Sequence, residues 1–177
     1  NGAEWQPLGS GMNSSVYALA VYDSELIAGG AFTQAGGVTV NCIARWNGSS
    51  WQPMGSGMGG PPPPFSPAVW ALVVYNNELV AGGNFQTAGG GNANYIARWN
   101  SLGWQPLGNG VGCGFDQVRA LAVYDDDLIA GGGFTCAGGS SANRVARWDG
   151  STWWPLGAGV AGQFGSEYVY ALTVHNY

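Results

Sequence analysis

The stretch VYALAVYDSELIAGGAF, from Val16 to Phe32, decides the fold of this protein. It returns as VWALVVYNNELVAGGNF from Val69 to Phe85 and as VRALAVYDDDLIAGGGF from Val118 to Phe134, and its opening returns once more at Val169. The complete copies begin 53 (69 − 16) and 49 (118 − 69) residues apart. Repetition at a period of 20–50 residues is the signature of solenoids, propellers and related arrays.

Two shorter blocks follow each copy and complete a repeat of four short strands. In the first repeat we expect strands at Val16–Tyr22, Leu26–Phe32, Cys42–Trp46 and Trp51–Gly55, separated by polar or glycine-rich turns. The Arg-Trp block recurs at Ile96–Trp99 and Val145–Trp148, and the Trp-x-Pro block at Trp5–Gly9, Trp104–Gly108 and Trp154–Gly157. No apolar period of 3.6 residues persists, and the runs are rich in β-branched and aromatic residues, so the chain is predicted to be all-β.

Four antiparallel strands at this spacing predict one blade of a β-propeller. We expect residues 1–177 to form a propeller segment with complete repeat units at about 16–55, 69–108 and 118–157, and partial units at 1–9 and 169–177. The partial units are a leading fourth strand and a trailing first strand. Because propellers close with four to eight blades, the segment is expected to belong to a larger ring, completed by further blades of the same parent chain or of another chain. A solenoid built from the same repeat remains the alternative fold.

The repeat resembles a known family. A Gly-Gly pair ends each second strand, and a Trp follows about twenty residues later, a pattern similar to the kelch repeat; the pairs are Gly29-Gly30, Gly82-Gly83 and Gly131-Gly132. The Ala-Arg-Trp-Asn/Asp-Gly hairpin and the Trp-x-Pro-Leu-Gly strand look still more like the kelch-like propeller repeats of secreted and surface-anchored bacterial proteins. The resemblance implies a β-propeller, and the related functions include protein binding, glycan binding and the copper radical chemistry of galactose oxidase. That oxidase needs His ligands, and this sequence has a single His, His175.

The composition narrows the class of partner. Gly and Pro supply 41 (32 + 9) of the 177 residues, but 46 % of the chain is hydrophobic and 13 % aromatic, which excludes simple disorder. Only 8 % is charged, the net charge is −5, and all five basic residues are Arg. Because nucleic-acid binding needs a basic surface that neutralises phosphates, no nucleic-acid partner is expected. No apolar run approaches the roughly 18 residues of a membrane helix, so no membrane insertion is expected either.

Residues that recur in every repeat are interpreted as scaffold. The glycines let neighbouring backbones approach closely, and the repeated tryptophans are expected to fill the space between blades, with Trp153 and Trp154 both candidates in the third repeat. Each recurring Arg is expected to bond carbonyls or an acidic turn, although a ring of them could bind an anion; they are Arg45, Arg98 and Arg147. The turn acids, densest at Asp125 to Asp127, lack the six to eight converging oxygens of a calcium site. Asn41, Asn94 and Asn143 are expected to fix loops through backbone bonds.

The loops that differ between the otherwise similar repeats indicate where a ligand would bind. In a propeller, the connections from a fourth strand to the next first strand and those from second to third strands share one face, which we call the loop face. The connections from a fourth strand to the next first strand differ in length and in sequence; they span residues 10–15, 56–68, 109–117 and 158–168. Their aromatic and acidic residues suit stacking on a sugar or anchoring a protein, and the predicted ligand-binding residues are Phe65, Phe115, Asp116, Phe164 and Tyr168. The alternative is that each Phe packs beneath its own loop.

The cysteines point to an exported protein. Cys113 precedes the third repeat and Cys136 lies in the loop between its second and third strands, so both should lie on the loop face and form a disulfide. Cys42 is left over. No spacing of Cys or His indicates a metal site, and no cofactor is expected.

The expected function is therefore a non-enzymatic, extracellular or cell-surface module that binds protein or glycan through its loop face. No nucleophile, base and acid can be assembled around a single His, and the only acids on the variable loops are Asp116 and Glu167. Two alternatives remain: a structural spacer or assembly element of a larger surface or filament protein, and the propeller part of an enzyme whose catalytic residues lie outside this segment.

Overall fold

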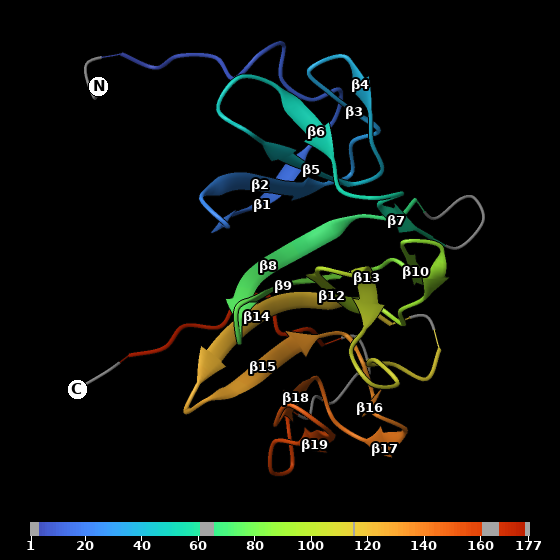
Figure 1. The fold of residues 1–177 in the computed structure, drawn as a ribbon. Helices are drawn as coiled ribbons and strands as arrows, with labels where there is room; N and C mark the ends of the chain where they lie inside the picture. The colour runs from blue at the N-terminus through green and yellow to red at the C-terminus, as the bar shows by residue number, and fades with distance from the viewer. Residues whose placement is uncertain (1–3, 61–65, 115, 161–166, 176–177) are drawn as a thin grey trace.

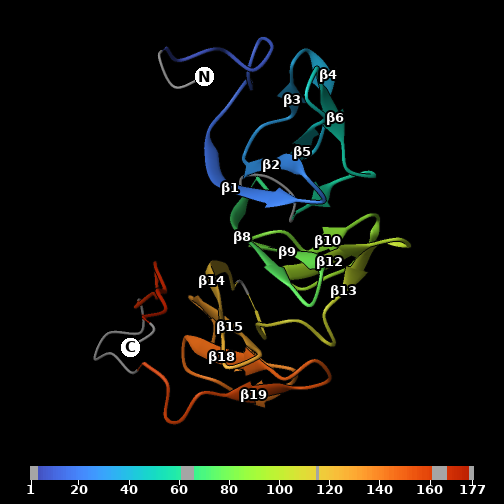
Figure 2. The ribbon, with the colours of Figure 1, turned by 60° about the vertical axis from the view of Figure 1, so that its left-hand side comes forward.

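Three four-stranded antiparallel sheets follow one another along the chain (Figures 1 and 2). The computed structural model describes residues 4–60, 66–114, 116–160 and 167–175. The first sheet has the order β1-β2-β5-β6, with β1 at Val16–Tyr22, β2 at Glu25–Gly30, β5 at Ile43–Trp46 and β6 at Trp51–Pro53. The second contains β8 (Val69–Tyr75), β9 (Glu78–Gly83), β12 (Ile96–Asn100) and β13 (Gly103–Pro106). The third contains β14 (Val118–Tyr124), β15 (Asp127–Gly132), β18 (Val145–Trp148) and β19 (Trp153–Pro155).

Short strands lie along one side of these sheets (Figure 1). Each loop between a second and a third strand forms a two-residue hairpin: β3 (Gln34–Ala35) with β4 (Val38–Thr39), β10 (Thr87–Ala88) with β11 (Gly91–Asn92), and β16 (Cys136–Ala137) with β17 (Ser140–Ser141). The chain entering each blade pairs with that blade's hairpin, through β7 (Met58–Gly59) on β10 and through the single bridges Met12 to Ala35 and Val111 to Ala137. The loop face is therefore held by backbone pairing in all three blades.

The turns that join the first two strands of each blade explain the regularity of the opposite face. Both central residues of each turn have positive φ, such as 50° at Asp23 and 62° at Ser24. Two-residue hairpins of this kind favour Asn, Asp and Gly because these residues tolerate the left-handed region best. The same turn is built by Asn76-Asn77 and by Asp125-Asp126. These acids thus have a conformational role in tight turns.

Neighbouring blades meet through their first strands, with β8 packed against both β1 and β14. The approach requires glycine: a Cβ on Gly29 would lie 2.5 Å from Cγ1 of Val69, and one on Gly82 would lie 2.5 Å from Cγ1 of Val118. The trailing segment 167–175 forms no strand but packs in the same way, since a Cβ on Gly131 would lie 2.6 Å from Cγ1 of Val169. The sequence repeat thus encodes a repeated interface between blades.

Tryptophans tie the outer parts of the blades together. The Trp at the start of each fourth strand is buried and donates its indole N–H, at 2.9 Å, to a carbonyl of the preceding fourth-strand segment: Trp51 to Leu8, Trp104 to Met54, and Trp153 to Leu107. Each also packs against a third-strand Trp in an edge-on or tilted arrangement, with ring centroids 5.3–5.5 Å apart. In the third blade the buried position is taken by Trp153, whereas Trp154 is 46 % exposed. These contacts, together with the four-stranded sheets and the glycine interfaces, define blades of a β-propeller, as predicted.

The first strand of the first blade is the least covered of the three first strands. In β1, Val16 is 40 %, Leu19 62 % and Val21 68 % exposed. In the second and third blades, Val69 and Val118 are fully buried because each lies on the glycine pair of the blade before it. Within the described residues no glycine pair precedes β1, so its side chains lack this cover.

Candidate functional site

A β-bulge marks the start of every first strand. In β1, Val16 pairs with Gly30 and Ala18 with Gly29, which leaves Tyr17 as the extra residue. The same shift leaves Trp70 in β8 and Arg119 in β14 without a partner. A bulge bends its strand and re-aims the side chain of the extra residue. Each blade therefore directs one side chain out of its ladder, at the end of the first strand nearest the loop face.

The side chains at these positions converge on one pocket. Tyr17, Trp70 and Arg119 line a cavity of about 400 Å³ together with Tyr170, which holds the same place in the trailing Val-x-Ala-Leu segment. Tyr17 and Tyr170 are 53 % and 65 % exposed, so their rings remain available to a ligand. We call this cavity the bulge pocket. Its volume falls within the roughly 300–1,000 Å³ of small-molecule sites.

Arg119 supplies the charge of the bulge pocket. Its guanidinium carbon lies 4.3 Å from the ring centroid of Trp70, 5.1 Å from that of Tyr170 and 5.3 Å from that of Tyr168. Cation–π contacts of this kind are attractive because the face of an aromatic ring carries negative charge. The Nε atom of Arg119 is buried and has no hydrogen-bond partner among the described residues. The aromatic rings thus hold the guanidinium in place without neutralising it.

Of the predicted ligand-binding residues, the structure describes Asp116 and Tyr168. Phe65, Phe115 and Phe164 lie outside the described residues. Tyr168 packs over Gly133, where a Cβ would collide with its ring, and it borders Arg119. Tyr168 therefore belongs to the surroundings of the bulge pocket.

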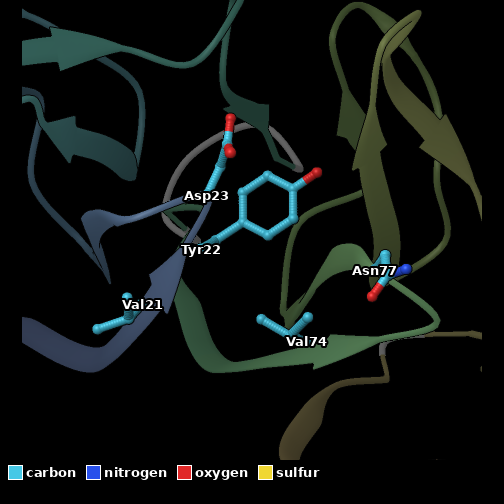
Figure 3. Close-up of a pocket in the computed structure, with 5 residues that line it drawn as sticks. All are labelled: Val21, Tyr22, Asp23, Val74 and Asn77. Carbon is cyan, nitrogen blue, oxygen red and sulfur yellow. The ribbon is translucent and has the colours of Figure 1, made fainter.

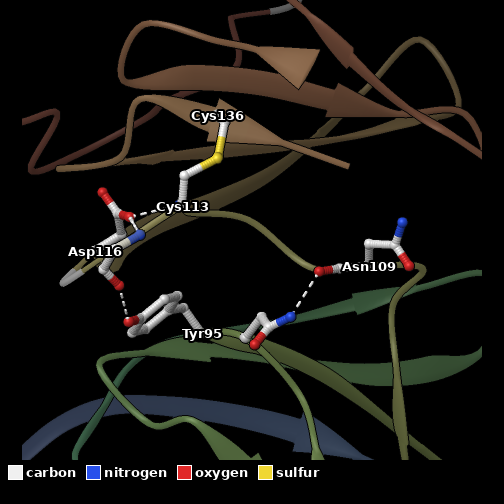
Figure 4. Close-up of a disulfide and its surroundings, with 7 residues drawn as sticks. Tyr95, Asn109, Cys113, Asp116 and Cys136 are labelled. Atoms are coloured by element: carbon white, nitrogen blue, oxygen red, sulfur yellow. Dashed lines mark hydrogen bonds between the residues drawn. A yellow bond between two sulfur atoms is a disulfide. The ribbon is translucent and has the colours of Figure 1, made fainter. Parts of the chain in front are cut away.

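Asp116 has a structural task in the loop that enters the third blade (Figure 4). Its Oδ2 accepts the backbone N–H groups of Cys113 and Gly114, both at 2.7 Å. The hydroxyl of Tyr95 donates to the carbonyl of Gly114 and fastens this loop to the second blade. Asp116 consequently shapes the loop that carries Phe115, and its carboxylate faces the chain's own backbone.

The predicted disulfide between Cys113 and Cys136 is present (Figure 4), with Cα atoms 5.9 Å apart. It links the entering loop to β16, two segments whose counterparts in the first two blades are joined by hydrogen bonds. The remaining cysteine, Cys42, which the sequence left unassigned, forms no disulfide within the described residues and is buried. Burial raises the pKa of the Cys42 thiol to about 11, so it stays protonated at neutral pH.

A second pocket lies at the opposite ends of the first strands (Figure 3). It has a volume of about 380 Å³ and is lined by Val21, Tyr22, Asp23, Val74 and Asn77. Figure 3 shows the Tyr22 ring between the first two blades, with Asp23 above it and Asn77 to its right. These are the positions at which the repeats are most alike in length and turn geometry. This pocket therefore offers less scope for specificity than the bulge pocket.

The other four arginines are paired with acids of the scaffold. The recurring arginines bond the acid that opens the second strand of their own blade, at 2.7–3.1 Å: Arg45 to Glu25, Arg98 to Glu78, and Arg147 to Asp127. Arg144 pairs with Glu167 at 3.5 Å. Asn41, Asn94 and Asn143 each donate to a loop carbonyl at 2.8–2.9 Å. No cluster of three or more His, Cys, Asp or Glu suited to a metal occurs in the described part of the chain.

Sequence reasoning missed the bulge residues, although a signal was present. In the repeated Val-x-Ala-Leu motif three positions are constant and the second varies, as Tyr17, Trp70, Arg119 and Tyr170. One variable position inside a constant strand is a candidate for specificity in the same way as a variable loop. The pattern was treated as an apolar strand because nothing in the sequence indicates a bulge.

Comparison with known proteins supports the architecture. A family model described as a domain of unknown function (DUF5122) β-propeller matches residues 76–103. This stretch begins in the turn before β9 and ends at the first residue of β13, so it covers the central part of the second blade. No curated protein matches the chain.

Proposed function

We propose that this protein is a non-enzymatic binding module of the kelch-like type, which recognises a glycan or protein ligand at its loop face. The observation that carries the proposal is the bulge pocket. Four copies of one motif keep their scaffold residues and vary the second position, whose side chain lines a shared cavity; in three of them a β-bulge directs that side chain. A purely structural repeat has no reason to vary that position among Tyr, Trp and Arg.

The rigidity of the loop face supports the same function. Backbone pairing anchors the entering chain to each hairpin, and the disulfide reinforces the third blade. Binding sites are most selective where a rigid scaffold presents varied side chains, because little ordering entropy is lost when the ligand arrives.

An extracellular or cell-surface location fits these features. Disulfides persist in oxidising compartments and are rare in the cytosol, and this one joins two segments of a face that we propose to be the binding surface. Within the described residues, no helix is long and apolar enough to cross a membrane.

The test is a binding screen on arrays of glycans and surface proteins with labelled protein. Trp70→Ala should abolish or strongly reduce any signal, whereas Val74→Ala, on the same strand at the other pocket, should retain it. Unfolding curves of both variants would show that they remain folded. Loss of binding in Val74→Ala but not in Trp70→Ala would place the ligand at the wrong end of the blades and contradict the proposal.

Exposure of β1 favours a second candidate, a role in assembly. Val16 and Leu19 occupy the positions by which the later first strands dock on a glycine pair, and here they are 40 % and 62 % exposed. In this role the exposed apolar side chains of β1 would pack against a second copy of the chain in solution, at a surface other than the three glycine pairs, which the chain itself covers. Leu19→Glu should then reduce the mass measured by light scattering, and Leu102→Glu, an exposed apolar residue away from β1, should not. A monomeric mass for the unmodified protein would reject this candidate.

A further inference from the structure

Arg119 stands apart from the other arginines of the chain. The remaining four form ion pairs with Glu25, Glu78, Asp127 and Glu167. Arg119 has no carboxylate partner among the described residues, and its buried Nε is unpaired there. A guanidinium that no carboxylate of the protein neutralises keeps its charge available to the carboxylate of a ligand.

The aromatic rings around Arg119 restrict the direction from which a ligand can approach its guanidinium. The guanidinium is planar, and Trp70 and Tyr170 lie within cation–π distance of it. Rings that contact a guanidinium through its faces leave the N–H donors, which lie in its plane, for another group. The donor pattern in that plane matches the two oxygens of a carboxylate, which it can bind with two parallel hydrogen bonds.

No acid competes for this charge. Among the described residues, the bulge pocket is lined by three aromatic residues and Arg119. The two acids on the variable loops have other contacts: the carboxylate of Asp116 accepts two backbone N–H groups, and that of Glu167 lies 3.5 Å from Arg144. In a protein with a net charge of −5, the bulge pocket is thus a local site of positive charge.

The aromatic lining indicates what carries the carboxylate. Tyr17 and Tyr170 expose ring surface and hydroxyl groups, which suit the C–H face and the hydroxyls of a sugar. The volume, about 400 Å³, lies at the lower end of the range for small-molecule sites and accommodates a compact ring rather than a length of peptide. Resting on the proposed function, we propose that the bulge pocket binds an acidic saccharide, with its carboxylate on Arg119 and its ring against Tyr17 and Tyr170.

Calorimetric titration tests the proposal with three probes: methyl glucuronide, the neutral methyl glucoside, and an N-acetylated tripeptide with a free C-terminal carboxylate. The glucuronide should bind, and rising salt should weaken it. Arg119→Gln should lower its affinity roughly tenfold to a hundredfold, since hydrogen bonds to charged groups contribute that much. Arg119→Lys keeps the charge but not the paired donors, so its loss should be smaller. Arg45→Gln, the same change at a half-exposed scaffold arginine, should leave binding unchanged.

The outcomes separate this proposal from the one before it. Equal binding of glucoside and glucuronide, with no effect of Arg119→Gln, would overturn the acidic ligand while leaving the loop face as a binding surface. Binding of the tripeptide alone would replace the saccharide by a peptide carboxylate and overturn the proposal. If none of the three binds, the proposal fails, and the array screen then decides separately whether the loop face binds any ligand.

Discussion

Adjacent tryptophans in β19 provide a sharp test of the packing between blades. The indole of Trp153 is 3 % exposed, packs against Trp148 at 5.5 Å and donates to the carbonyl of Leu107 in the preceding blade. Trp154, one residue later, is 46 % exposed and donates to Asp149 on the surface. The two share a strand and a residue type and differ only in what covers them.

Truncating the buried ring should cost far more than truncating the exposed one. Trp153→Ala leaves a cavity between blades and an unpaired carbonyl at Leu107, and changes of this kind cost about 3–5 kcal/mol. Trp154→Ala should cost below about 1 kcal/mol, as surface changes do. For a chain of this size, the larger loss corresponds to a fall in melting temperature of roughly 6–20 °C.

Urea unfolding followed by circular dichroism measures both variants. Trp153→Phe keeps a six-membered aromatic ring but loses the five-membered ring with its N–H, so its cost should lie between those of the two alanine variants. Equal destabilisation by Trp153→Ala and Trp154→Ala would refute the assignment of Trp153 to the interface between blades.

Three further predictions concern single features of the fold. Replacing both Cys113 and Cys136 by Ser should lower the free energy of unfolding by about 3 kcal/mol, because the disulfide spans 23 residues of sequence; an unchanged urea midpoint would contradict this. Gly82→Ala should cost about 1–3 kcal/mol, since its Cβ would lie 2.5 Å from the next blade, while Gly91→Ala, with nothing nearer than 3.8 Å, should be close to neutral in thermal unfolding. Backbone hydrogen bonds hold the pKa of Asp149 well below its ordinary value of 3.8, so its stabilisation is present at neutral pH and is lost as pH falls below about 4. Asp149→Asn keeps the turn without titrating, and its stability should fall less between pH 7 and pH 2.5 than that of the unmodified protein.

The scaffold could be predicted because it repeats. Each glycine pair, each Arg with the acid of its own blade and each loop Asn occurs three times, and repetition at equivalent positions shows that these residues serve the common unit. The disulfide followed from topology, since both cysteines belong to loops on the same face of one blade. The predicted ligand-binding residues and the bulge pocket meet at one point, Tyr168, whose ring centroid lies 5.3 Å from the guanidinium carbon of Arg119.

The residues that line the bulge pocket come from four repeats, and their convergence depends on geometry that one repeat does not reveal. The bulge arises from a register shift between the first two strands, and register is a property of the pair of strands. The sequence of β14 shows an Arg within an apolar strand, a position where a charge would ordinarily be paired. Only the bulge explains why Arg119 can leave the ladder and stack between rings of two neighbouring segments.

By itself the sequence determined the four-stranded unit, its turns and the glycine contacts between units, because these depend on short-range patterns and on the room that a missing Cβ leaves. Only the tertiary structure decided which residues meet: Trp153 rather than Trp154 between blades, β1 with its apolar side chains exposed, and Arg119 among aromatic residues from other repeats. The physical reason is that burial and convergence depend on which blade lies next to which. Every copy of the repeat specifies the same interface, but the neighbours present at each copy determine whether that interface is filled.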